Sequence, residues 1–236
     1  NVIVTGPSGT GKTTISKFVV KQLIKQSFGI RWGYVNCIST SAKSAICHSL
    51  VRDAGRGNDL RPEGTPVSIY FDRLREMDDQ FVAILDEVDV LDDHTTIHAL
   101  HEIPNVTLIL VCVSGDTLFT DLDSRVVSRL RGAAKVSLTK YGHSELRDIL
   151  EGRIAAGLQR NSVENDVADY IADIAAGDAR HAIALLRRAV RHAVKRGEDR
   201  VAVENVVTVR DEARKEIHER RIDTLGTHQR HLYEII

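Results

Sequence analysis

Two short stretches of this 236-residue chain carry residue types and spacings suited to phosphate chemistry. The first has the pattern Gly-x4-Gly-Lys-Thr and directly follows a short apolar run. It comprises Gly6, Pro7, Ser8, Gly9, Thr10, Gly11, Lys12, Thr13 and Thr14. Its glycines allow backbone N–H groups to wrap around phosphate oxygens at the start of a helix. We expect Lys12 to reach the outer phosphates and the Thr13 hydroxyl to hold Mg²⁺.

The second stretch, residues 81–87, is an apolar run that ends in two adjacent carboxylates, Asp86 and Glu87. Asp86 is predicted to bind Mg²⁺ through its water, and Glu87 to orient and activate the attacking water. By itself such a pair fits an exposed turn equally well, but together with the first stretch it indicates nucleotide hydrolysis. The sequence has no Asn-Lys-x-Asp segment that would read guanine, so the expected cofactors are ATP or ADP with Mg²⁺.

Five short runs rich in Val and Ile alternate with longer polar or amphipathic stretches, a pattern typical of a parallel sheet with crossover helices. The predicted strands are residues 2–4, 34–37, 81–85, 106–113 and 135–138. The first crossover helix is expected over residues 12–26, with an inner face made of Ile15, Phe18, Val19 and Leu23. After residue 138 no strand pattern recurs convincingly, and the rest of the chain is predicted to be helical.

The predicted fold class is therefore α/β, with a nucleotide-binding domain over residues 1–140 and a small all-helical domain over residues 141–222. A formal net charge of -1 argues against attraction of the whole molecule to nucleic acid or anionic lipid, although local basic patches remain possible. The three cysteines lack paired spacing and indicate free thiols in a reducing compartment. No apolar run approaches the roughly 20 residues that cross a bilayer, so we expect a cytoplasmic protein without a membrane partner.

Three segments resemble the archaeal and eukaryotic origin-recognition and cell-division-control replication initiators, which are AAA+ ATPases. They read "LDEVDVL" at residues 85–91, "SGDTLFTDLDSRVVSRL" at 114–130 and "GDARHAIALLRRA" at 177–189. The resemblance covers nearly the whole chain. It implies a P-loop AAA+ domain, a helical lid, and the first helix of a winged-helix domain at residues 223–236. We expect a piece of a longer initiator that lacks the segment over the adenine and most of the winged helix.

The resemblance also implies partners and a location. Such an initiator binds double-stranded origin DNA, helps to load the replicative helicase and can associate with other AAA+ subunits. It would lie at the nucleoid in an archaeon and in the nucleus in a eukaryote. Arg52, Arg56 and Arg61 fall roughly where initiators insert a helix that contacts DNA, and a plain solvated loop is the alternative.

Further residue roles follow from the resemblance. Arg180 falls at the sensor-2 position on the lid, where a guanidinium couples the outer phosphate to the position of the lid. Arg129 falls where these ATPases can carry an arginine finger that acts on a neighbouring subunit's nucleotide, and Arg125 is the alternative. The sensor-1 position departs from the family, because Gly115 stands where Asn is common. Either Ser114 or Asp116 takes over the role, or hydrolysis is slow.

Two alternative functions stay open from the sequence. The chain fits another AAA+ machine, such as a clamp loader, because the lid segment is compatible with several of these. Gly115 also fits a nucleotide-gated DNA-binding switch with negligible turnover.

Overall fold

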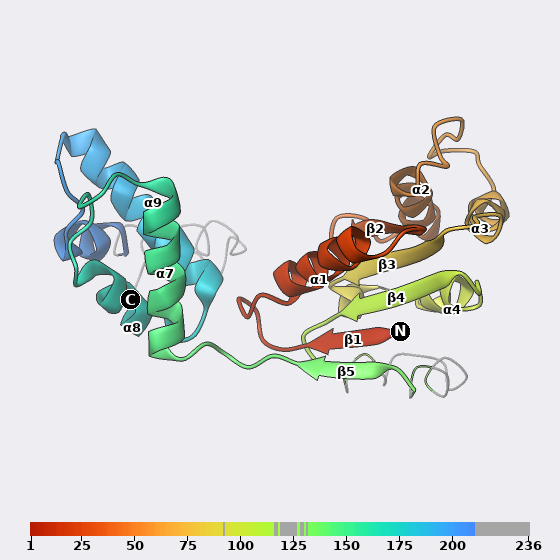
Figure 1. The fold of residues 1–236 in the computed structure, drawn as a ribbon, viewed down its shortest axis with the longest axis horizontal. Coiled ribbons are helices and arrows are strands. Elements are labelled where there is room, and N and C mark those ends of the chain that lie inside the picture. The colour runs from red at the N-terminus through yellow and green to blue at the C-terminus, as the bar shows by residue number, and fades with distance from the viewer. Residues whose placement is uncertain (92, 116–117, 119–126, 128–129, 131, 211–236) are drawn as a thin grey trace, which may run out of the picture. The chain divides into compact units, whose positions relative to one another are not determined.

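The computed structural model describes residues 1–91, 93–115, 118, 127, 130 and 132–210. The chain divides into two compact units, Asn1–Lys140 and Tyr141–Ile236 (Figure 1). The segments with Arg125, Arg129 and Asp116, and residues 223–236, lie outside the described residues. The part of the chain that the structure describes contains no helix long and apolar enough to cross a membrane.

The first unit is built on a five-stranded parallel sheet, as the sequence predicts. Its strands are β1 (Val2–Thr5), β2 (Ile30–Asn36), β3 (Gln80–Asp86), β4 (Val106–Val111) and β5 (Ala134–Ser137). Their spatial order is β2-β3-β4-β1-β5. β1 therefore lies between β4 and β5, and its carboxyl end meets the carboxyl ends of β3 and β4 at one edge, where ligands bind in open parallel sheets.

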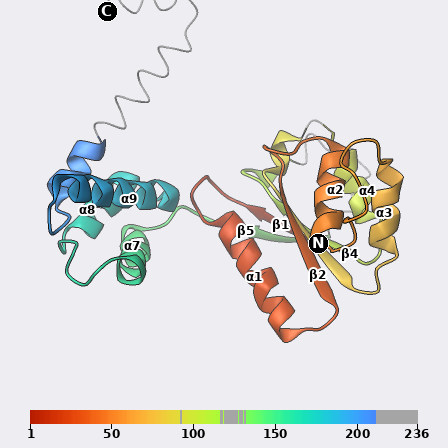
Figure 2. The same cartoon turned by 90° about the horizontal axis from the view of Figure 1, so that it is seen from above.

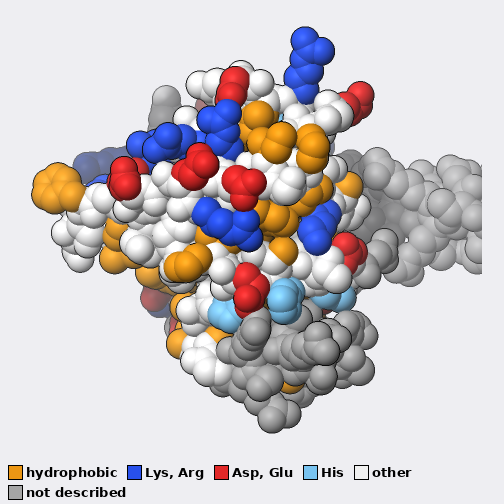
Figure 3. All heavy atoms as spheres, turned by 90° about the vertical axis from the view of Figure 1, so that its right-hand side faces the viewer, with side chains coloured by type: hydrophobic (Ala, Val, Ile, Leu, Met, Phe, Trp, Pro, Cys, Tyr) orange, Lys and Arg blue, Asp and Glu red, His pale blue; other side chains and the backbone are white. Residues whose placement is uncertain are grey.

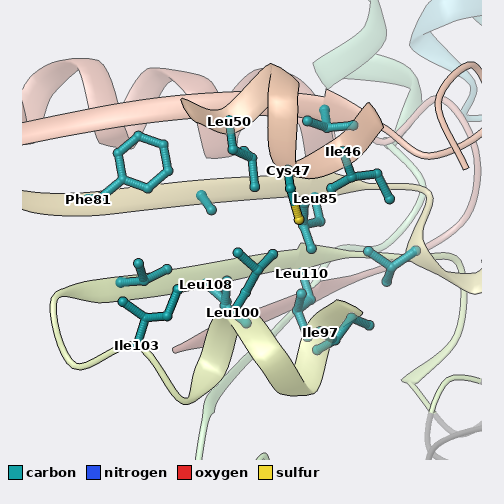
Figure 4. Close-up of a cluster of buried hydrophobic side chains, with 14 of the residues drawn as sticks. Ile46, Cys47, Leu50, Phe81, Leu85, Ile97, Leu100, Ile103, Leu108 and Leu110 are labelled. Carbon is teal, nitrogen blue, oxygen red and sulfur yellow. The ribbon is translucent and has the colours of Figure 1, made fainter. Parts of the chain in front are cut away.

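Helices cover both faces of this sheet (Figure 2). One face carries α1 (Lys12–Gln26), and the opposite face carries α2 (Lys43–Asp53), α3 (Val67–Arg75) and α4 (Thr95–His101). A short 3₁₀ turn, η1 (Val88–Val90), follows β3. The larger core lies under α2, α3 and α4, where Leu50, Phe81, Leu85 and Leu100 are fully buried (Figure 4). Alternate residues of the central strands thus point into different cores, which explains their nearly continuous apolar sequence.

The helix predicted at residues 12–26 is present with those bounds, but its predicted inner face is wrong. The four side chains expected inside are partly or largely exposed: Ile15 at 41%, Phe18 at 55%, Val19 at 52% and Leu23 at 40%. Lys12, Ser16 and Val20 are buried instead. The phosphate-binding loop sets the rotation of α1, because the lysine that opens the helix must turn toward the loop. Residues four and eight positions later then follow it inward.

The second unit is helical, as predicted. It contains α7 (His143–Gly157), α8 (Val167–Ala175) and α9 (Ala179–Arg196), and its only described strand-like contact is a single bridge between Val163 and Val201. The three helices bury a core of their own that includes Leu146, Ile171 and Leu185. Gly197, at a φ of 70°, ends α9 in the left-handed region that glycine adopts most readily.

Candidate nucleotide-binding site

The loop between β1 and α1 packs closely against the backbone just after β5, at Gly6. Gly6 has a φ of 145°, and a β-carbon there would lie 2.4 Å from the backbone oxygen of Leu138, just after β5. The Lys12 ammonium is buried and donates to the backbone oxygens of Gly6 at 2.6 Å and Pro7 at 3.0 Å. The Thr10 hydroxyl also donates to the Pro7 oxygen, at 2.9 Å. These bonds hold the loop in a closed curve around its own lysine.

The structure brings Asp86 to this loop from the end of β3. Its carboxylate is only 2% exposed, and Oδ2 accepts a hydrogen bond from the Thr13 hydroxyl at 2.7 Å. The Glu87 backbone N–H donates to the other oxygen, Oδ1, at 3.1 Å. A hydroxyl and a carboxylate are hard oxygen ligands of the kind that Mg²⁺ prefers. The chemistry and spacing of these two side chains therefore fit a magnesium ion beside bound phosphates.

Tyr34 is a member of this site that the sequence analysis missed. Its hydroxyl donates to Asp86 Oδ2 at 3.0 Å, and the Lys17 ammonium lies 3.1 Å from the centre of its ring. Burial, and next the charge of Asp86, raise the pKa of Tyr34 to about 12, so this hydroxyl remains a donor at neutral pH. Burial also lowers the pKa of Lys17. The only sequence signal was a tyrosine in a predicted strand, which is more often a packing residue.

Glu87 adopts an unusual backbone conformation at the end of β3. Its φ of 56° and ψ of 46° lie in the left-handed region, which non-glycine residues occupy at a cost and mostly at functional sites. Two residues later, Asp89 Oδ2 accepts a hydrogen bond from the Val113 N–H at 3.3 Å. The turn that carries Glu87 is thereby tied to the segment after β4, where Gly115 stands.

The proposed sensor residues fall in different parts of the structure. Arg180 is exposed in the first turn of α9, in the second unit. Asp178 caps this helix, because its side chain accepts a hydrogen bond from the His181 N–H at 3.0 Å. A β-carbon added to Gly115 would lie 3.4 Å from Thr5 Cγ2, which is about van der Waals contact distance.

Arg52 lies in the last turn of α2, and Arg56 and Arg61 lie in the connection that follows this helix. Arg52 lies 3.6 Å from the carboxylate of Asp53. Figure 3 shows the surface on the side of α2 and α3, where basic and acidic side chains are mixed. Among the described residues, ion pairs join Arg73 and Arg75 of α3 to Asp59 and Asp72, and Arg31 of β2 to Asp79. This surface is of mixed charge, so any phosphate contact there has to come from individual arginines.

Comparisons with known proteins agree with this architecture. An AAA domain model matches residues 1–150, and a model of the Cdc6 AAA+ ATPase-type lid domain matches residues 147–211. ORC1-type DNA replication protein 9 of Halobacterium salinarum is 37% identical over 235 residues, which cover 99% of this chain and 66% of that protein. ORC1-type DNA replication protein 1 of the same organism is 36% identical, with 98% of this chain and 75% of that protein covered.

A solved structure gives the same result. The Aeropyrum pernix ORC1 protein, determined in complex with DNA, superposes with a TM-score of 0.81 and 28% sequence identity. The match covers 97% of this chain and 63% of that one, so the chain spans about two thirds of the length of the proteins it resembles. The parallel sheet, the phosphate-binding loop and the helical second unit define a P-loop ATPase of the AAA+ class. Within that class the chain belongs to the ORC1-type DNA replication proteins.

Proposed function

We propose that this chain binds ATP with Mg²⁺ at the loop between β1 and α1 and hydrolyses it slowly, as the nucleotide switch of an origin-binding replication initiator. The observation that carries the proposal is the convergence of Thr13 and Asp86, 2.7 Å apart, beside the buried Lys12. Membership of the ORC1-type family supports ATP as the nucleotide and replication as the process.

Each residue of the site has a proposed role. The N–H groups of the loop, together with Lys12, bind phosphate oxygens at the start of α1. The Thr13 hydroxyl and the Asp86 carboxylate hold Mg²⁺, which when bound supplies positive charge to the phosphate oxygens. Glu87 orients and deprotonates the attacking water. Arg180 binds the outer phosphate and so couples its presence to the position of the lid, and Arg129 acts on the nucleotide of a neighbouring subunit.

DNA and the replicative helicase are the proposed partners of the full-length protein. The related Aeropyrum pernix ORC1 protein was solved in complex with DNA, which supports DNA as a partner here. Because the net charge is -1, contact depends on local arginines such as Arg52, Arg56 and Arg61 rather than on the field of the whole molecule. The ORC1-type relatives favour an initiator over a clamp loader.

Gly115 favours a second candidate, a nucleotide-gated switch without meaningful turnover. Glycine has no side-chain amide that could position a water against the outer phosphate. Under this candidate, the state of the nucleotide changes by exchange rather than by hydrolysis.

Radiolabelled ATP, incubated in excess with the purified protein, separates these candidates. The initiator ATPase gives several turnovers, and Glu87→Gln lowers the rate by about 10²- to 10⁴-fold while ATP still binds. Glu63→Gln, an exposed carboxylate in the connection between α2 and α3, is the matched control and keeps the wild-type rate. Tight ATP binding with no product beyond one equivalent supports the switch. ATP binding that Lys12→Ala leaves unchanged would overturn the proposed site.

A further inference from the structure

Asp86 receives hydrogen bonds from three separate elements of the first unit. The Thr13 hydroxyl comes from α1, the Tyr34 hydroxyl from β2, and the Glu87 N–H from the turn after β3. Thr13 and Tyr34 share Oδ2, whereas Glu87 binds Oδ1. Both carboxylate oxygens are therefore engaged, and the plane of the carboxylate is fixed from both sides.

The sheet register explains how Tyr34 reaches Asp86. Asn36 is paired with Asp86 and Tyr34 with Ile84, so Tyr34 starts two residues back along the neighbouring strand. Residues two apart on a strand point to the same face. The phenol ring is long enough to span this offset along the face that α1 covers, where Tyr34 packs against the smaller core.

Lys17 holds the ring in this position. It lies one helical turn after Thr13 on α1, and its ammonium lies 3.1 Å from the centre of the Tyr34 ring. A cation over an aromatic face is attracted by the negative charge of that face. The ring of Tyr34 thus contacts Lys17 of α1, whereas its hydroxyl donates to the Asp86 carboxylate. A substitution can therefore remove the hydrogen bond and keep the contact with Lys17.

We propose that Tyr34 is a positioning residue for the magnesium site, whose hydroxyl holds the Asp86 carboxylate in the orientation that receives Mg²⁺. This inference rests on the proposed function, because it takes Asp86 as the carboxylate that serves the metal. Groups that orient a metal-serving side chain contribute about 10- to 100-fold to metal affinity. Without the Tyr34 hydroxyl, the described bonds that remain are those of Thr13 to Oδ2 and of the Glu87 N–H to Oδ1, so the orientation of the carboxylate is held less firmly.

The test measures Mg²⁺ through nucleotide binding rather than through turnover. A fluorescent ATP analogue is titrated into wild-type protein and Tyr34→Phe at increasing free Mg²⁺, starting from EDTA. The phenylalanine ring keeps its contact with Lys17 and removes only the hydroxyl. We expect the Mg²⁺ concentration at half-effect to rise about 10-fold or more, while the affinity in EDTA and the urea midpoint stay near the wild-type values.

Tyr70→Phe is the matched control. The Tyr70 hydroxyl donates to the Arg61 backbone oxygen at 2.8 Å, on the opposite face of the sheet from α1. This variant also loses one phenolic hydrogen bond, but the Mg²⁺ dependence stays at the wild-type value. A Tyr34→Phe curve that overlays wild type would overturn the role of Tyr34. A wild-type protein whose nucleotide binding ignores Mg²⁺ would instead count against the proposed function itself, so the two failures are distinguishable.

Discussion

Gly33 tests how closely α2 packs on the strand that carries Tyr34. It is buried in β2, and a β-carbon there would lie 2.9 Å from Phe81 Cζ and 3.2 Å from both Asp53 Cβ and Leu50 Cδ2. Asp53 and Leu50 belong to α2, and Phe81 to the adjacent β3. Gly33→Ala therefore inserts a methyl group where three side chains already meet.

The expected cost follows from those three distances. Real β-carbons essentially never approach a neighbour within 3.0 Å, so the Phe81 ring has to move, although both it and Leu50 are fully buried. Extra carbon in a packed core costs about 1–3 kcal/mol. We expect Gly33→Ala to lower the free energy of unfolding of the first unit by that amount.

Urea denaturation followed by tryptophan fluorescence measures this change, because Trp32 is the only tryptophan and lies next to Gly33. Gly115→Ala is the control in the same unit, since among the described residues its β-carbon would contact Thr5 Cγ2 alone, at 3.4 Å. Its stability should stay within about 0.5 kcal/mol of wild type. Equal stabilities for the two variants would refute the claim that α2 leaves no room above Gly33.

Four further outcomes are expected. Gly115→Asn, which supplies the side-chain amide that glycine lacks, should raise the multiple-turnover ATPase rate, and an unchanged rate would show that this position does not limit hydrolysis. Asp178→Ala should lower the thermal stability of the second unit by about 0.5–2 kcal/mol, with Asp178→Asn close to wild type, and equal losses in both variants would remove the capping role. Burial raises the pKa of the Cys37 and Cys47 thiols to about 12 and that of the Cys112 thiol to about 11. Native protein at pH 8 should therefore resist a thiol reagent that labels all three in urea. In the unfolded protein these thiols ionise at a lower pH than in the native protein. The stability of the first unit should therefore fall as pH rises above about 9 and go on falling up to the native pKa values. A urea midpoint that stays constant between pH 8 and 10.5 would contradict this.

The sequence predicted the sheet and the meeting of the two phosphate-related stretches for one physical reason. Carboxyl ends of parallel strands gather at one edge, so a loop after β1 and a carboxylate at the end of β3 converge there even though β4 lies between the two strands. Nothing about side-chain orientation is required for that prediction. This is why Thr13 and Asp86, which lie 73 positions apart in the sequence, could be predicted to serve the same Mg²⁺ ion.

The rotation of α1 and the role of Tyr34 could not be predicted in the same way. Hydrophobic spacing favoured Ile15 and Phe18 as inner residues, but the buried Lys12 fixes the rotation of the helix against that preference. Tyr34 reaches Asp86 only because β2 and β3 pair in one particular register, and register depends on contacts between distant strands. Both outcomes depend on tertiary packing rather than on local pattern.

The hydrogen bonds at Asp86 bear on whether this site is built for binding or for turnover. The carboxylate is already oriented by Thr13, Tyr34 and the Glu87 N–H, so under the proposed function little rearrangement is required before Mg²⁺ and phosphate are held. In contrast, the position at which the proposed function expects a side chain that orients the attacking water is Gly115, which has no side chain. Under the proposed function, the preorganised groups thus lie on the metal side of the site. This asymmetry supports the proposal that the bound nucleotide is held for long and hydrolysed slowly.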